Sequence, residues 1–158
     1  MKPLLLGIDP GLSGALALLN TVDGDLEEVI DMPLREIRGK KWVDLYALAM
    51  WLDTRRSGIR KAIIEEVHSM PNQGVASTFR FGYATGAVTG AVTANMIPAT
   101  LIPPTVWKMQ MGVTHDKATS LAMARKLWAP RADLFKRKKD DGRAEAALLA
   151  EYGRRLKF

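Results

Sequence analysis

The chain has 158 residues, of which 47% are apolar and none is cysteine. This length and balance predict one folded domain, residues 1–158, and exclude a disordered or rod-like chain. The absence of cysteine excludes a disulfide framework, a zinc site ligated by cysteine and a thiol nucleophile. With 23 Lys and Arg against 17 Asp and Glu, the net charge of +6 favours a polyanionic partner, most simply nucleic acid.

The start of the chain predicts neither export nor a membrane anchor. An apolar run follows Met1-Lys2-Pro3, but it meets the charge of Asp9 too soon for a signal peptide. No stretch reaches the roughly 18 apolar residues that a membrane-spanning helix needs. We therefore expect a cytoplasmic protein that does not enter a membrane.

The first part of the chain predicts three strands. Residues 4–8 and 15–19 are compact apolar runs, and the turn-forming Asp9-Pro10-Gly11 follows the first of them. A third run, residues 26–32, follows the hairpin signal Asp23-Gly24. Three strands in succession are therefore expected.

The middle of the chain predicts helices that alternate with strands. Apolar residues recur at helical spacing over residues 42–52, and Gly58 suits the end of that helix. Residues 61–67 predict a fourth strand, which a crossover helix would place parallel to the first. Residues 74–95 predict a helix with a small-residue face that can pack closely on a neighbour, and residues 99–102 predict a fifth strand. The small residues are Ala84, Gly86, Ala87, Gly90, Ala91 and Ala94.

The last part of the chain predicts helices. Thr105 can cap a short helix that holds Lys108, and a second helix is expected over residues 117–128. Residues 129–140 are polar and basic, and residues 142–152 predict a final helix. The order of elements predicts an α/β fold with a mixed five-stranded sheet and helices on both faces.

Acidic residues occur at three separate places where a site can form. Asp9 and Glu65 each close an apolar strand, and strand ends are where α/β sheets carry their sites, although either residue alone also suits the start of a solvated loop. Asp140, Asp141 and Glu145 stand at the start of the last helix, where acids also complement the helix dipole. Asp141 and Glu145 are one turn apart, so both can face the same way.

Separated carboxylates in a basic protein indicate a divalent cation, because the acids would otherwise repel one another. Mg²⁺ takes one or two protein carboxylates and fills its other positions with water and substrate phosphate. Two such ions about 4 Å apart can clamp the attacking and leaving oxygens of a phosphoryl displacement. The pattern therefore predicts a metal-dependent nuclease.

Five segments, taken in order, make the chain similar to RuvC-type Holliday junction resolvases, above all to the compact phage-encoded branch of that family. They are Gly7-Ile8-Asp9-Pro10-Gly11-Leu12-Ser13-Gly14-Ala15, Ile64-Glu65-Glu66-Val67, Pro104-Thr105-Val106-Trp107-Lys108, Asp116-Lys117-Ala118 and Asp141-Gly142-Arg143-Ala144-Glu145-Ala146. The resemblance runs from about Lys2 to Tyr152 and implies an RNase H-like fold. It also implies a homodimer that nicks opposed strands of four-way and other branched DNA with Mg²⁺ or Mn²⁺. Such a protein would be phage- or prophage-encoded and would act in the cytoplasm of a bacterial host.

The resemblance also assigns roles to individual residues. Asp9 matches the aspartate of the first strand and Glu65 the glutamate of the fourth, whereas Glu66 would point to the other face. Lys108 and Lys117 match basic positions near the scissile phosphate. The implied catalytic residues are Asp9, Glu65, Asp141, Glu145 and Lys117, of which the four acids would hold metal. The implied DNA contacts are Lys108, Lys117, His68 and Arg143.

The chain departs from the family at the last helix. Resolvases of this family usually carry their final two ligands three residues apart, but Gly142 stands three residues before Glu145. Asp141, four residues before Glu145, lies on nearly the same helical face. The choice of ligands among Asp140, Asp141 and Glu145 therefore stays open at this point.

Other aromatic, histidine and basic residues have two interpretations each. His68 stands where bacterial members often carry an aromatic wedge, so it either stacks on a base or is a plain loop residue. Phe79, Phe81 and Tyr83 can also stack on bases, but we expect them in the core. Residues 136–139 form a basic run that tracks a DNA strand or is simply solvated.

Three alternative functions compete with a junction resolvase. The segment from Gly7 to Gly11 also resembles the phosphate loop of actin-like and sugar-kinase ATPases, but those need two such lobes and 158 residues provide one. A second alternative is a non-catalytic module that binds branched DNA. A third is an RNase H-like nuclease that acts on RNA or on RNA–DNA hybrids.

Overall fold

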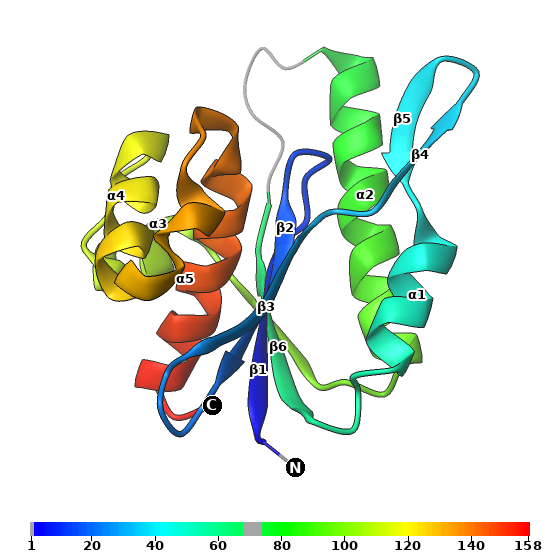
Figure 1. Cartoon of the computed structure of the whole chain (residues 1–158). Helices are drawn as coiled ribbons and strands as arrows, with labels where there is room; N and C mark the ends of the chain where they lie inside the picture. The colour runs from blue at the N-terminus through cyan, green and yellow to red at the C-terminus, as the bar shows by residue number, and fades with distance from the viewer. Residues whose placement is uncertain (1, 68–73) are drawn as a thin grey trace.

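A five-stranded mixed sheet forms the centre of the computed structural model, which describes residues 2–67 and 74–158 (Figure 1). Its strands, in the order β3-β2-β1-β6-β7, are β3 (Leu26–Asp31), β2 (Ala15–Asn20), β1 (Leu4–Asp9), β6 (Ile59–Glu65) and β7 (Ala99–Ile102). β1, β2 and β3 are antiparallel neighbours, whereas β6 runs parallel to β1 and β7 runs parallel to β6. The predicted mixed five-stranded sheet is confirmed. The predicted parallel pairing of its first and fourth strands in chain order, β1 and β6, is also confirmed.

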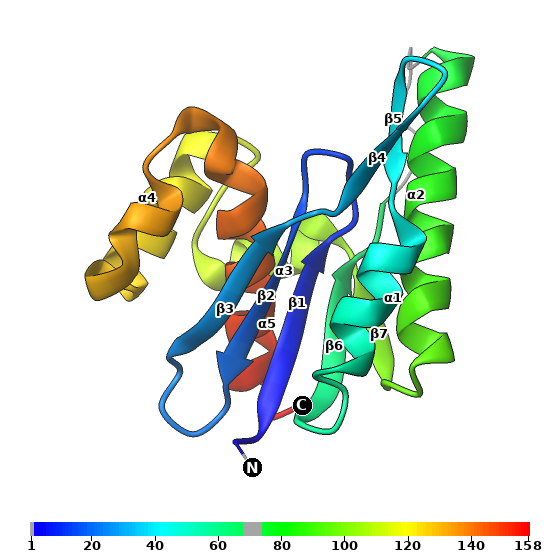
Figure 2. The ribbon, with the colours of Figure 1, turned by 45° about the vertical axis from the view of Figure 1, so that its right-hand side comes forward.

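Helices cover both faces of the sheet, as the sequence predicts (Figures 1 and 2). On one face lie α1 (Leu45–Asp53) and α2 (Val75–Ala94), and on the other lie α3 (Pro104–Met111), α4 (Lys117–Leu127) and α5 (Asp141–Arg155). Two 3₁₀ segments, Ala129–Phe135 and Lys138–Asp140, occupy the polar and basic stretch before α5. Within the described parts of the chain, no helix combines the length and the apolar character needed to cross a bilayer.

Alternation along the strands divides the buried residues between the two faces. Leu5 and Ile63 pack in the cluster under α5, whereas Leu6 and Ile64 pack under α1 and α2. The contact of α5 with β1 is especially close, because a Cβ at Gly7 would collide with the helix backbone at the Ala146 carbonyl oxygen. Helix α5 therefore lies directly on the strand that ends in Asp9.

A two-stranded hairpin precedes the first helix, and its last two residues are the first two of the stretch that the sequence predicts as helical. β4 (Leu34–Ile37) pairs with β5 (Lys40–Val43), so Trp42 is in a strand and the helix prediction is wrong there. The turn between the strands holds Arg38 and Gly39 at φ 51° and 70°, the positive values that a tight two-residue hairpin turn requires. Helix α1 begins only after Asp44, whose carboxylate caps it by accepting from the Ala47 N–H at 3.0 Å.

The predicted small-residue face of α2 is correct at Ala84 and Ala91, which pack in the apolar cluster on that face of the sheet, but wrong at Gly86 and Gly90. The helix buries Ala84, Val88 and Val92. By contrast, a Cβ added at Gly86 or Gly90 would meet no atom within 4 Å. The larger β-branched residues therefore fill the contact with the sheet, and these two glycines face outward.

Candidate active site

The ends of two parallel strands bring Asp9 and Glu65 to the same edge of the sheet. Asp9 is the last residue of β1 and Glu65 the last of β6, and the register pairs Ile8 with Ile64 just before them. The Asp9 carboxylate accepts from the Gly11 N–H at 3.2 Å, which holds it against the turn into β2. The structure therefore brings together the two acids that the sequence places at strand ends.

Helix α5 adds Asp141 and Glu145 to this edge. Both side chains are buried, with 7% and 8% of their surface exposed. The start of the helix rests on the β1–β2 turn, where a Cβ at Gly142 would collide with the Ser13 carbonyl oxygen and with Gly14. Position 142 therefore has no room for a ligand side chain. We call Asp9, Glu65, Asp141 and Glu145 the carboxylate cluster.

Burial, and then the charge of neighbouring acids, raises the pKa values of two members of the carboxylate cluster. Burial, followed by the charge of Glu145, raises the pKa of Asp9 from 3.8 to about 6. Burial, followed by the charges of Asp9 and Glu145, raises the pKa of Glu65 from 4.5 to about 8. The four acids are thus close enough to repel one another in the absence of a cation.

Two lysines neutralise the two acids of α5. Lys108, buried in α3, donates to Oε1 of Glu145 at 2.5 Å, and Ser120 of α4 donates to the same oxygen at 3.4 Å. Lys117, the first residue of α4, forms an ion pair with Asp141 that raises the Lys117 pKa. The Lys117 side chain is 65% exposed, whereas that of Lys108 is 10% exposed. Lys117 can therefore reach a ligand from its present position, and Lys108 mainly holds Glu145.

The donor set of the carboxylate cluster fits a hard divalent cation. Its oxygens are the ligands that Mg²⁺ prefers, and four acids against two lysines leave an excess of negative charge. Across residues 2–67 and 74–158, no three Asp, Glu or His side chains are already drawn together tightly enough to hold an ion. A bound cation would relieve the repulsion that raises the pKa values of Asp9 and Glu65.

Asp140 does not belong to the carboxylate cluster. Its carboxylate accepts from the backbone N–H of Arg137 at 2.7 Å and from the Arg137 guanidinium at 2.7 and 2.9 Å. This pairing lowers the pKa of Asp140 and satisfies a buried charge just before α5. The structure therefore separates Asp140, at the end of the second 3₁₀ segment, from Asp141, the first residue of α5.

Arg143, another predicted DNA contact, lies outside the carboxylate cluster. Arg143 donates twice to Asp31, at 2.6 and 2.7 Å, and so ties α5 to the end of β3. His68 lies outside the described residues. In the basic run 136–139, Arg137 pairs with Asp140, and all four side chains are exposed. The DNA-binding roles of these residues stay predictions.

The expectation that three aromatic residues of α2 lie in the core is wrong for two of them. Phe79 is 66% exposed and Tyr83 is 40% exposed, whereas Phe81 is half-buried. Their neighbour is Trp42 of the unpredicted hairpin, whose ring meets that of Tyr83 edge to face at 5.2 Å. Gly39 is the sequence signal that could have predicted this hairpin, because glycine favours the tight turn formed by Arg38 and Gly39. A hairpin at that turn places Trp42 on a strand.

No protein-family model matches the chain, and no curated protein matches it. Solved structures do. RuvC from Thermus thermophilus in complex with a Holliday junction substrate is 18% identical, with a TM-score of 0.65 over 98% of this chain and 96% of that one. A second Thermus thermophilus RuvC structure is 18% identical, with a TM-score of 0.62 and the same two coverages. Ydc2, the yeast mitochondrial Holliday junction resolvase, is 16% identical, with a TM-score of 0.62 over 99% of this chain and 79% of its own. The predicted RNase H-like fold of the RuvC type is therefore confirmed.

Proposed function

We propose that this chain is a structure-specific endodeoxyribonuclease that nicks paired strands of Holliday junctions and other branched DNA. The observation that carries the proposal is the carboxylate cluster, in which Asp9 and Glu65 at two strand ends face Asp141 and Glu145 of α5. The likeness in fold to a RuvC bound to a Holliday junction supports branched DNA as the substrate. The net charge of +6 supports a phosphate-rich ligand.

The carboxylate cluster would hold Mg²⁺, for which Mn²⁺ would substitute. When bound, the metal supplies a water of lowered pKa and neutralises charge on the phosphate that is cut. Asp9 is fixed by the Gly11 N–H and Glu145 by Lys108, so each acid is held in place before substrate arrives. This preorganisation is what a two-sided carboxylate site needs for in-line displacement.

The two lysines of the site have different roles in this proposal. Lys117 is exposed beside Asp141 at the start of α4, so its ammonium can contact the scissile phosphate. Lys108 is buried and pairs with Glu145, so its main role is to position that carboxylate rather than to contact a phosphate. Loss of Lys117 would thus lower cleavage more than DNA affinity.

Paired nicking requires two active sites, because the two cuts fall on opposed strands of one junction. A homodimer with two-fold symmetry supplies them in the matching arrangement. A phage or prophage origin and action in the cytoplasm of a bacterial host remain predictions from the sequence resemblance.

The test is cleavage of a synthetic four-way junction beside a fork, a linear duplex and an RNA–DNA hybrid, each with Mg²⁺ and with EDTA. We expect paired nicks in the junction, with Mg²⁺ only, and slower cutting of the linear duplex. Tight junction binding without any cleavage would instead identify a binding module. Preferential cutting of the hybrid would identify a nuclease of the RNase H type.

A further inference from the structure

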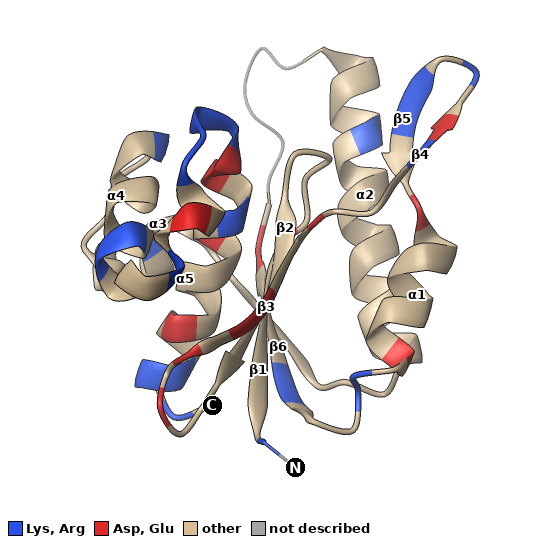
Figure 3. Ribbon diagram, viewed as in Figure 1, with Lys and Arg blue, Asp and Glu red and all other residues tan. Residues whose placement is uncertain are grey.

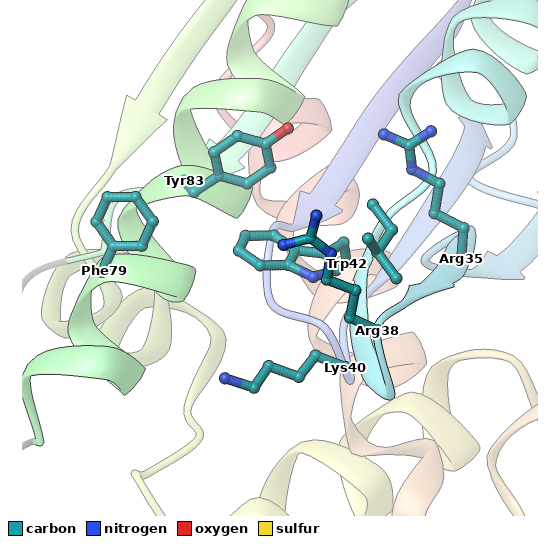
Figure 4. Close-up of a pocket in the computed structure, with 7 residues that line it drawn as sticks. Arg35, Arg38, Lys40, Trp42, Phe79 and Tyr83 are labelled. Atoms are coloured by element: carbon teal, nitrogen blue, oxygen red, sulfur yellow. The ribbon is translucent and has the colours of Figure 1, made fainter.

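The β4–β5 hairpin and α2 form an open cavity of about 590 Å³ (Figure 4). None of its lining residues belongs to the carboxylate cluster. Its main lining residues are Arg35, Arg38, Lys40 and Trp42 from the hairpin and Phe79 and Tyr83 from α2. We call this cavity the hairpin pocket. The side chains of the two elements face one another across it (Figure 4). Its size falls within the roughly 300–1,000 Å³ that small-ligand sites occupy.

The floor of the hairpin pocket is aromatic and reached by solvent. Trp42 and Tyr83 meet edge to face with ring centroids 5.2 Å apart, which fixes the face of the indole. Phe79, one helical turn before Tyr83, is 66% exposed and lines this pocket and an adjoining hollow. Exposed aromatic faces in a fixed position are surfaces on which nucleic-acid bases stack.

The rim of the hairpin pocket is positively charged. Arg35, Arg38 and Lys40 line it, and Arg80 lines the adjoining hollow. Within residues 2–67 and 74–158, none of these four cations is in an ion pair. No carboxylate lines either hollow, and Glu36, the one acid of the hairpin, alternates with Arg35 and so points to the other side of the strand. The free cations therefore suit phosphates on either side of a stacked base.

The hairpin pocket and the carboxylate cluster lie at the same end of the molecule. The hairpin and the N-terminal half of α2 extend past the ends of β1 and β6, where Asp9 and Glu65 lie (Figures 1 and 2). Lys and Arg lie on the hairpin, and near the start of α5 acids lie side by side with Lys and Arg (Figure 3). A DNA strand that leaves the carboxylate cluster on this side would pass over the hairpin.

We propose that the hairpin pocket binds an unpaired nucleotide of the DNA substrate, with its base stacked on Phe79 and Trp42. Arg35, Arg38 and Lys40 hold the flanking phosphates. This inference rests on DNA as the substrate, as the proposed function states, but not on cleavage. It extends that function by naming a strand segment without base pairs as the feature that the hairpin recognises.

A second copy of the chain is a poorer occupant of the same surface. A two-fold interface buries the same patch on both copies, so it would bring the unpaired cations of two pockets into one interface. Like charges placed together in this way are repelled, whereas phosphates attract them. The charge of the rim thus favours nucleic acid.

The test measures binding of a four-way junction and of a single-stranded oligothymidine to the full chain in EDTA, which prevents cleavage. Stacking is worth roughly 1–3 kcal/mol per base, so Phe79→Ala should raise Kd for both DNAs about 5- to 100-fold. Phe79→Trp should restore it. Arg38→Ala should make the salt dependence of oligothymidine binding shallower by about 0.7 for each lost phosphate contact. The matched controls are Phe158→Ala and Arg60→Ala, which change exposed residues near the opposite end of β6 and should leave Kd unchanged.

Photo-crosslinking locates the base. Junctions that carry 5-iodouracil in unpaired positions beside the branch should crosslink to Phe79, Trp42 or Tyr83, as mapped by mass spectrometry. Unchanged affinity of Phe79→Ala with crosslinks elsewhere would overturn the pocket assignment. A Phe79→Ala protein that light scattering shows as monomer, where the parent is a dimer, would instead make this surface an interface between copies. If the parent chain binds with Phe79 dependence but never cuts, the pocket stands and the nuclease proposal fails.

Discussion

The two faces of the sheet are built in opposite ways. On the α5 face, the backbone of α5 packs directly on β1 at Gly7 and on the β1–β2 turn at Gly142. This close packing leaves Asp141 and Glu145 of α5 buried. On the α1–α2 face, a small separate hairpin stands beside α2, and its aromatic and basic side chains reach solvent. In our proposals, the first region positions the groups that carry out the chemistry, whereas the second contributes affinity through accessible side chains. Substitutions in the first should therefore change rates, and substitutions in the second should change binding.

The largest effect is expected from removing charge at the strand ends. Asp9→Asn should lower junction cleavage by more than about 100-fold with little loss of affinity, because the amide keeps the shape but cannot ligate metal as a carboxylate does. Glu65→Gln should behave in the same way. Glu66→Gln is the control and should retain most activity. Single-turnover cleavage and binding in EDTA separate the two quantities, and near-normal cutting by Asp9→Asn would remove Asp9 from the ligand set.

The next effect separates two adjacent acids of the α5 face. Asp141→Asn should lower cleavage by about 10- to 100-fold and should shift the Mg²⁺ and Mn²⁺ dependence of the rate, because a ligand is lost. Asp140→Asn removes only the partner of Arg137, so it should cost about 1 kcal/mol of unfolding free energy with little change in metal dependence. Metal titrations of cleavage and urea unfolding of both variants measure this. A metal shift in Asp140→Asn alone would reverse the assignment.

Two glycine substitutions test the packing difference between the faces. Gly142→Ala should destabilise the protein by about 1–3 kcal/mol and lower cleavage, because its Cβ would push α5 off the β1–β2 turn. Gly86→Ala, on the open side of α2, should instead stabilise it by up to about 1 kcal/mol, since alanine favours a helix more than glycine does. Thermal unfolding and junction cleavage of both variants provide the comparison. Equal stability of the two variants would contradict the close contact at Gly142.

The smallest effect is a pH dependence that belongs to the carboxylate cluster alone. Glu65 titrates near 8 in the folded chain against its ordinary 4.5, so the folded state keeps a proton that the unfolded state has released. The free energy of unfolding of the metal-free protein should therefore fall as pH rises through this range. Because solvent reaches part of Glu65, we expect on the order of 1 kcal/mol between about pH 6 and pH 8. Urea unfolding in EDTA measures it, and a curve for Glu65→Gln as steep as that of the parent would exclude Glu65 as its source.

The sequence predicts the regular part of the fold because apolar runs and turn residues agree there. The strands that end in Asp9 and Glu65 are in place, and their meeting follows from parallel pairing. The hairpin was missed because Trp42 and the apolar residues after it also match helical spacing, and its turn carries Arg38-Gly39 where Asn-Gly or Asp-Gly is the usual signal.

Side-chain pairing in the site is harder to predict than backbone position. The partners Lys108 and Glu145 are 37 residues apart, and only the packing of α3 on α5 brings them together. Asp140 and Arg137, by contrast, are only three residues apart, but the sequence alone does not show whether Asp140 pairs with Arg137 or binds metal. Trp42 of the missed hairpin contacts Tyr83 and lines the same pocket as Phe79, so missing the hairpin also hid this aromatic surface.

The turn between β1 and β2 contacts both the strand and the helix that carry the carboxylate cluster. Asp9 is held by the Gly11 N–H, and α5 rests on Ser13 and Gly14 through Gly142. Because Asp9 and α5 are both held against this turn, a displacement of the turn should move the strand acid and the helix acids together. The distance between the strand carboxylate and the helix carboxylates should therefore vary less than the position of either one.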